Sequence, residues 1–172
     1  ATTRCKATAA STPCAVAHPC DESSLRGAVQ ALEMGLLKPI LVGPKARIEA
    51  VAKQFKIDIS GCEVVDAPHS VGSAETAVRL AREGKAEMLM KGSLHTDELM
   101  AAVVKRETGL RTGRRLSHVF IMDVPTYHKV LIVTDGAINI APSLEDKVDI
   151  CQNAIDLARS LGVARPKVAI LG

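Results

Sequence analysis

The residues best suited to chemistry follow apolar segments, where strands are expected to end. Lys91-Gly92 closes the apolar run EMLMKG (87–92), and Thr96-Asp97-Glu98 then opens a helix-like segment. A lysine ammonium can neutralise a phosphate, and a glycine lets the backbone approach it closely. The two acids instead stabilise a helix N-terminus. Residue types and spacing alone slightly favour a solvated strand-end lysine over a phosphate site.

A second polar turn, TDGAIN (134–139), follows another strongly apolar segment. Asp135 and Asn139 could hydrogen-bond a ligand, although an Asx turn closing the strand is the commoner arrangement. The basic connector LRTGRR (110–115) offers Arg111, Arg114 and Arg115 as phosphate ligands. A solvated connector explains these arginines at least as well.

The familiar catalytic motifs are missing from the sequence. There is no Walker loop, no G-x-G-x-x-G fingerprint and no G-x-S-x-G elbow. Five histidines are present but show no triad spacing with serine and aspartate: His18, His69, His95, His118 and His128. His18 is notable only because it follows the first expected strand. Spacing therefore indicates an α/β protein with a phosphate-bearing ligand and an unknown reaction.

The composition restricts the class of protein. The 172 residues are 47% hydrophobic, carry a formal charge of +3 and include no tryptophan, which fits an aliphatic core and not a nucleic-acid-binding surface. No apolar run approaches membrane-spanning length. Five scattered cysteines without a C-x-x-C pair predict a reduced, cytoplasmic protein without a structural zinc. Residues 1–13 are expected to be a linker or leader.

Strand and helix patterns alternate along the chain, which predicts a parallel α/β sheet with right-handed crossovers. The rhythm breaks after residue 116, where two strands follow each other directly, so we expect domains at 14–116 and 117–172. Gly35, Gly84 and Gly162 are expected helix ends, and Ser143 with Asp146 approximates a capping box. Strands are expected at 14–18, 39–43, 63–67, 87–92, 117–124, 127–136 and 167–171, and helices from residue 23, from residue 44, and at 73–86, 96–109 and 141–162.

The final expected strand, 167–171, lacks obvious neighbours in the second domain. We therefore expect the second domain to be truncated, as the start of a larger α/β unit. The alternative is that this strand joins the first sheet and closes a single domain.

Long motifs add a resemblance to a known family. MKG…HTDELM, GLRTGRR-SHVF and TDGAINIAP, with HPCDESSLRGAVQALEMGLLKPILVGP nearer the start, resemble the phosphate acetyl/butyryl transferase family. The similarity covers nearly the whole chain from about residue 15. It looks closest to the phosphate acyltransferase half of proteins that carry an upstream enoyl-CoA hydratase domain.

The resemblance implies a parallel-sheet α/β/α sandwich, like that of isocitrate and isopropylmalate dehydrogenases. It implies reversible transfer of an acetyl or butyryl group between CoA and phosphate, by a homodimer or higher homo-oligomer without a metal or redox cofactor. The family's catalytic residues lie beyond Gly172, so none is assigned in this chain. The positions matching its substrate-binding segments are Lys91, Gly92, Thr96, Arg111, Arg114, Asp135 and Asn139.

Two alternatives remain open at this point. The chain alone could be a fragment that binds acyl phosphate or CoA without turnover. Alternatively, the acyl donor could be an acyl carrier protein in place of CoA.

Overall fold

The structure is a computed structural model that describes residues 12–171. These residues belong to two units, one ending at Arg111 and the other beginning at Thr112. The predicted boundary between two domains, after residue 116, stays a proposal. Most of the expected linker or leader, 1–13, lies outside the described residues, although Pro13 already belongs to the first strand.

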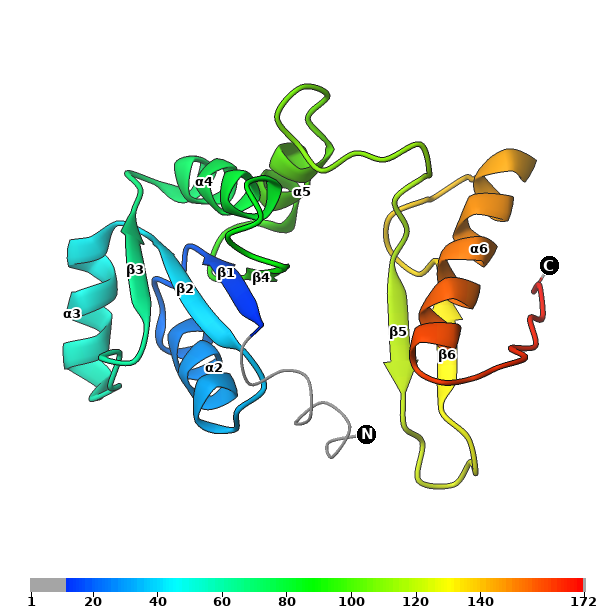
Figure 1. The fold of residues 1–172 in the computed structure, drawn as a ribbon, viewed down its shortest axis with the longest axis horizontal. Coiled ribbons are helices and arrows are strands. Elements are labelled where there is room, and N and C mark those ends of the chain that lie inside the picture. The colour runs from blue at the N-terminus through cyan, green and yellow to red at the C-terminus, as the bar shows by residue number, and fades with distance from the viewer. Residues whose placement is uncertain (1–11, 172) are drawn as a thin grey trace. The chain divides into compact units, whose positions relative to one another are not determined.

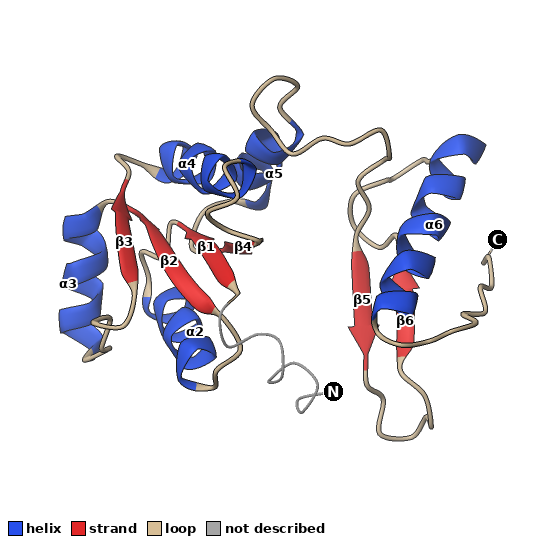
Figure 2. Cartoon of the chain, in the orientation of Figure 1, coloured by secondary structure: helices blue, strands red, loops and turns tan. Residues whose placement is uncertain are grey.

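A four-stranded parallel sheet forms the centre of the first unit (Figure 2). Its strands are β1 (Pro13–Ala17), β2 (Lys38–Gly43), β3 (Glu63–Asp66) and β4 (Met88–Lys91), in the order β3-β2-β1-β4. β1 pairs with β2 on one side and β4 on the other, so that Ala15 lies opposite both Ile40 and Leu89. Strands buried on both faces read as continuous apolar runs, which explains the sequence of β1 and β2.

Helices cover both faces of this sheet (Figure 1). α2 (Glu22–Glu33) and α3 (Lys45–Phe55) pack on one face with the side chains of Cys14, Val16 and Leu41. α4 (Ser70–Arg82) and α5 (Thr96–Val104) pack on the other, where the buried residues are mostly alanine. The predicted parallel α/β/α sandwich is confirmed for this unit, while its closer likeness to the dehydrogenases stays a prediction.

Local signals in the sequence fix the helix ends. Gly35 and Gly84 adopt positive φ angles of 65° and 71° just after α2 and α4, as expected for glycine at a helix C-terminus. α5 ends at Val104, five residues before the predicted end, because the chain turns back at Lys105. The Leu110 N–H then donates to the Val103 carbonyl over 2.8 Å, and Leu110 packs against the alanine-rich core.

The second unit contains a two-stranded antiparallel sheet and one long helix. β5 (Val119–Met122) pairs with β6 (Leu131–Thr134), and α6 (Leu144–Ser160) follows. The predicted capping box is confirmed: the Asp146 N–H donates to Ser143 Oγ over 3.2 Å, and the Ser143 N–H donates to Asp146 Oδ2 over 3.0 Å. Gly162, with φ of 90°, ends this helix as expected.

The predicted strand at 167–171 is wrong. These residues are irregular, and Ile170 and Leu171 are 75% and 91% exposed. A strand is stable only when a neighbour satisfies its backbone groups, and within residues 12–171 this segment has no strand partner. It therefore does not close the first sheet either.

Candidate functional site

The carboxyl edge of the first sheet has a topological switch point between β1 and β4. From β1 the chain builds outward through β2 to β3, and then crosses back to place β4 on the opposite side of β1. Open α/β sheets bind ligands in the crevice at such a point. Here the edge is formed by the residues after β1, from His18 to Asp21, and by the loop between β4 and α5.

Gly92 allows these two segments to touch through their backbones. Its N–H donates to the Ala17 carbonyl over 2.9 Å, and the Ser93 N–H donates to the His18 carbonyl over 2.9 Å. A Cβ at residue 92 would lie 2.4 Å from the Ala17 oxygen. Ser93 Oγ also donates to the His18 carbonyl and accepts from the Cys20 N–H. Gly92 therefore allows the two backbones to pack closely. Its predicted contact with a phosphate stays a prediction.

Lys91 lies at the end of β4 with its ammonium directed to its own loop. Nζ donates to the Leu94 carbonyl over 2.8 Å and to the Gly92 carbonyl over 3.3 Å. Its charge also acts on Asp21, where two Ser24 hydrogen bonds are the largest causes of a lowered pKa and Lys91 adds to them. An ammonium has three hydrogens, so one donor remains for a ligand at this edge.

The acids at the start of α5 are used to stabilise the helix. The His95 N–H donates to Glu98 Oε2 over 2.8 Å, and Ser70 Oγ donates to Glu98 Oε1 over 2.6 Å. These bonds lower the pKa of Glu98, that from Ser70 contributing most. Thr96, the first residue of α5, is exposed beside them. In the sequence, Lys91 suggests an anion site while the nearby acids suggest the opposite. The structure removes this conflict for Glu98, because its carboxylate is already hydrogen-bonded.

His18 is a buried polar residue at the same edge. Its residue is 6% exposed, its φ is 57°, and its Nδ1 lies 3.1 Å from Ser73 Oγ. Ser73 gives its single hydroxyl hydrogen to the His69 carbonyl over 2.7 Å, so it must accept from Nδ1–H of His18. Burial lowers the pKa of His18, which keeps the ring neutral near pH 7.

The second unit holds Asp135 and Asn139 in a turn of the expected Asx type. Asp135 Oδ1 accepts from the N–H groups of Ala137 and Ile138 over 3.0 and 3.1 Å, and Oδ2 accepts from the Asn139 N–H over 3.2 Å and from its side-chain amide. Desolvation raises the pKa of Asp135, but these bonds outweigh it and lower the pKa to about 2. The carboxylate is thus saturated by its own turn.

Two connector arginines are paired within the second unit. Arg114 Nη1 lies 2.7 Å from Asp156 Oδ2 on α6, and Arg115 Nε donates to Asn139 Oδ1 over 2.8 Å. Arg111, the last residue of the first unit, is exposed and makes no ion pair within residues 12–171. Arg114 therefore pairs with a carboxylate of its own unit, and Arg111 is the arginine of this set without an ion pair in the described residues.

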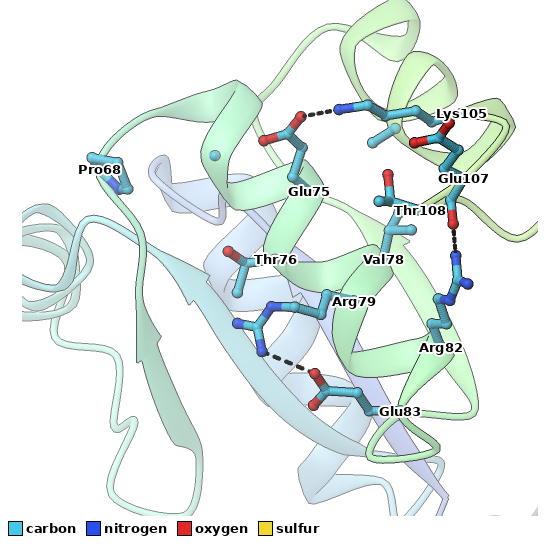
Figure 3. Close-up of a pocket in the computed structure, with 12 residues that line it drawn as sticks. Pro68, Glu75, Thr76, Val78, Arg79, Arg82, Glu83, Lys105, Glu107 and Thr108 are labelled. Carbon is cyan, nitrogen blue, oxygen red and sulfur yellow. Dashed lines mark hydrogen bonds and ion pairs between the residues drawn. The ribbon is translucent and has the colours of Figure 1, made fainter.

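A separate pocket of about 690 Å³ lies between α4 and the segment 102–108, at the end of α5, in the first unit (Figure 3). Its charged side chains are matched with one another: Lys105 bonds Glu75 over 3.1 Å and Arg79 bonds Glu83 over 3.2 Å. Arg82 donates to the Glu107 carbonyl. Because its cations are already paired, this pocket is less suited to an anion than the carboxyl edge is.

In the described part of the chain, no three His, Cys, Asp or Glu side chains come together as metal ligands would. None of the helices in residues 12–171 combines the length and apolar character needed to span a bilayer.

The family model described as "Phosphate acetyl/butaryl transferase" matches residues 71–172, which include the β4–α5 loop and the whole second unit. The chain belongs to this family. It is 60% identical over 156 residues to a phosphate acetyltransferase of Rhizobium meliloti, covering 91% of this chain and 49% of that protein. It is 37% identical over 155 residues to a phosphate butyryltransferase of Clostridium acetobutylicum, covering 90% of this chain and 52% of that protein.

Solved structures agree with the transferase family assignment. A branched-chain phosphotransacylase from Enterococcus faecalis V583 superposes with a TM-score of 0.75 at 27% identity, over 90% of this chain and 54% of that one. The chain spans about half the length of the relatives it matches. The resemblance drawn from the sequence motifs is confirmed at the level of the family.

Within the transferase fold, the predicted site residues fall into separate groups. Lys91, Gly92 and Thr96 share one strand-loop-helix segment of the first unit, while Asp135 and Asn139 are bonded to each other in the second. Sequence reasoning gave no role to Ser73 and missed its bond to His18, 55 residues away. The available signal was a buried-looking histidine directly after the first strand.

Proposed function

We propose that the intact protein reversibly transfers a short acyl group, acetyl or butyryl, between CoA and phosphate. The observation that carries this proposal is 60% identity, over 91% of this chain, to a protein named phosphate acetyltransferase. Because the chain is also similar to a phosphate butyryltransferase, we include butyryl among the proposed acyl groups. Acyl-CoA and phosphate are then the substrates, and no metal or redox cofactor is needed.

The chemistry assigns a definite task to the carboxyl edge. In the direction of acyl-CoA synthesis a base takes the CoA thiol proton, the thiolate sulfur bonds to the acyl carbon, and the carbon–oxygen bond to phosphate breaks. Phosphate leaves with additional negative charge, so a cation beside it stabilises the transition state. We assign this role to Lys91, with Gly92 and Thr96 shaping the loop. Arg111, Arg114, Asp135 and Asn139 are proposed as further substrate-binding residues.

The catalytic base is not assigned in this chain. The relatives are about twice as long as the chain, which supports placing the remaining catalytic groups in the rest of the polypeptide. The 172-residue chain alone would then bind substrate without turnover. Turnover by that chain alone would show that the base lies within it.

The protein's setting follows from the proposed reaction. Acyl-CoA and phosphate are cytoplasmic metabolites, and Cys14, Cys20, Cys62 and Cys151 are free thiols, as a reducing compartment favours. Cys5 lies outside the described residues. We also propose that the protein forms a homodimer or higher homo-oligomer. An enoyl-CoA hydratase domain is proposed upstream in the same polypeptide.

The test compares Lys91→Ala with Lys38→Ala in the intact protein. Both lysines are exposed, but Lys38 begins β2 at the opposite edge of the sheet. The account expects Lys91→Ala to raise the KM for phosphate roughly tenfold, with a smaller effect on the KM for acyl-CoA, and Lys38→Ala to leave both unchanged. If Lys91→Ala changes the KM values for phosphate and acyl-CoA equally, or changes neither, Lys91 has a purely structural role.

A further inference from the structure

We propose that Arg47 binds a phosphate group of a substrate together with Lys91, at the carboxyl edge of the first sheet. This inference rests on the proposed acyltransferase function and adds a residue of α3 to its binding site. It also brings in the side of the edge formed by β2.

Arg47 is an exposed cation at the carboxyl edge of the first sheet. It lies in the first turn of α3, directly after β2, so it stands at the carboxyl edge of the sheet. It is exposed, and within residues 12–171 its guanidinium makes no hydrogen bond or ion pair. The arginines of α2 and α4 are bonded: Arg26 to Glu22, Arg79 to Glu83 and Arg82 to the Glu107 carbonyl.

The charges of Arg47 and Lys91 both act on Asp21. Asp21 follows β1, and after the Ser24 hydrogen bonds its lowered pKa reflects the charges of both Lys91 and Arg47. β2 and β4 flank β1 on opposite sides. One cation follows β2 and the other ends β4, so the two flank the end of β1 along the carboxyl edge.

Two acids near this edge, Asp21 and Glu98, already have hydrogen-bond donors. Asp21 Oδ1 accepts from the Ser24 N–H over 2.8 Å and from the Ser24 hydroxyl over 2.5 Å. Glu98 is bonded to Ser70 and His95, as described above. His18 is kept neutral, first by burial and then by the charge of Arg47. Asp21 and Glu98 therefore already have donors, whereas the guanidinium of Arg47 has no bonded partner within residues 12–171.

The chemistry of these cations selects a phosphate group. A guanidinium offers a planar fork of donors that matches two phosphate oxygens, while an ammonium adds a compact charge. The group could be inorganic phosphate, or equally the phosphoryl end of an acyl phosphate. It could also be a phosphate of CoA, which has the same recognition chemistry. The experiment distinguishes these sources.

The test uses Arg47→Ala, Arg47→Lys and the control Lys53→Ala in the intact protein. Lys53 is an exposed cation in the last turn of the same helix, away from the carboxyl edge. Alanine is favourable in helices, so these exposed substitutions leave the fold intact. Kinetics give the KM for phosphate, for acyl-CoA and for the acyl thioester of 3′-dephospho-CoA. Binding is measured separately, as the rise in unfolding temperature caused by phosphate or CoA.

Arg47→Ala should raise the KM for one phosphate-bearing substrate, and its dissociation constant, roughly tenfold, with Arg47→Lys intermediate and Lys53→Ala within about twofold. A rise for phosphate assigns the site to the transferred phosphate. A rise for acyl-CoA assigns it to CoA, and specifically to the 3′-phosphate if the dephospho substrate is unaffected. If neither substrate is weakened by Arg47→Ala more than by Lys53→Ala, the inference is overturned.

This outcome is separable from the fate of the proposed function. If the wild-type protein binds phosphate or CoA through Arg47 but shows no turnover, the proposed acyltransferase function is refuted and the proposed Arg47 site is supported. If Arg47→Ala keeps full activity and unchanged binding, the Arg47 site is refuted and the acyltransferase function is supported.

Discussion

Replacing Gly92 with alanine tests whether the β1–β4 junction is built on direct backbone contact. The added Cβ would lie 2.4 Å from the Ala17 carbonyl oxygen and 2.6 Å from that of His18. Ordinary contacts of this kind begin at 3.4 Å, so the two segments would have to separate by about 1 Å (3.4 − 2.4). Both obstructing atoms belong to the backbone of the central strand's end, which cannot turn aside as a side chain can.

The separation has a predictable energetic cost. Three hydrogen bonds of 2.8–2.9 Å cross this junction: from the Gly92 N–H, the Ser93 N–H and the Ser93 hydroxyl. Stretching each by about 1 Å breaks it, and a typical bond contributes about 1 kcal/mol. The expected loss is about 2–3 kcal/mol, which for a unit of this size lowers the melting temperature by roughly 10–20 °C.

The assay is thermal unfolding followed by circular dichroism, with Gly27→Ala as the matched control. Gly27 lies within α2, and a Cβ there would meet nothing within 4 Å. Alanine should therefore stabilise the helix at residue 27 by about 0.5–1 kcal/mol. A Gly92→Ala protein as stable as the wild type would refute the close-contact reasoning, whatever the control shows.

Three further predictions concern single side chains. Asp135 has a folded pKa of about 2 against an ordinary 3.8, so it stabilises the fold above pH 3.8 and loses this effect as pH falls towards 2; Asp135→Asn should flatten that part of the stability profile measured by urea unfolding. The pKa of His18 is lowered from 6.5, so stability should fall as pH drops below 6.5, and His18→Gln should remove this dependence in the same measurement. Ser143→Ala should destabilise α6 by about 1 kcal/mol through loss of its cap, seen as reduced amide protection by hydrogen exchange. Unchanged profiles in the first two variants, or unchanged exchange in the third, would contradict the respective assignment.

Local signals made most of the first unit predictable. The alternation of apolar runs and helical periods indicated the parallel sheet, and the glycines after α2 and α4 marked their ends through their positive φ angles. The Ser143–Asp146 cap was equally readable, because both partners lie within one helical turn. In each case the physical cause acts between residues close in the sequence.

The errors and omissions involve partners distant in the sequence. The segment 167–171 has the apolar pattern of a strand but no neighbouring strand in the described chain, and pattern alone cannot supply one. The pairing of Arg114 with Asp156 spans 42 residues, and that of His18 with Ser73 spans 55. At Gly92 the sequence predicts a close approach to a phosphate, which stays a prediction, and the atoms that require glycine there belong to Ala17 and His18.

We propose that the intact protein uses the cationic carboxyl edge of its first sheet to transfer acyl groups to phosphate. The most direct measurement is the release of free CoA from acetyl-CoA and butyryl-CoA by the full-length protein, with and without phosphate, and with Lys91→Ala beside the wild type. The account predicts phosphate-dependent release with at least one of the two substrates, and a higher phosphate requirement in the variant. Absence of phosphate-dependent release with both, and with longer acyl-CoAs, would contradict it.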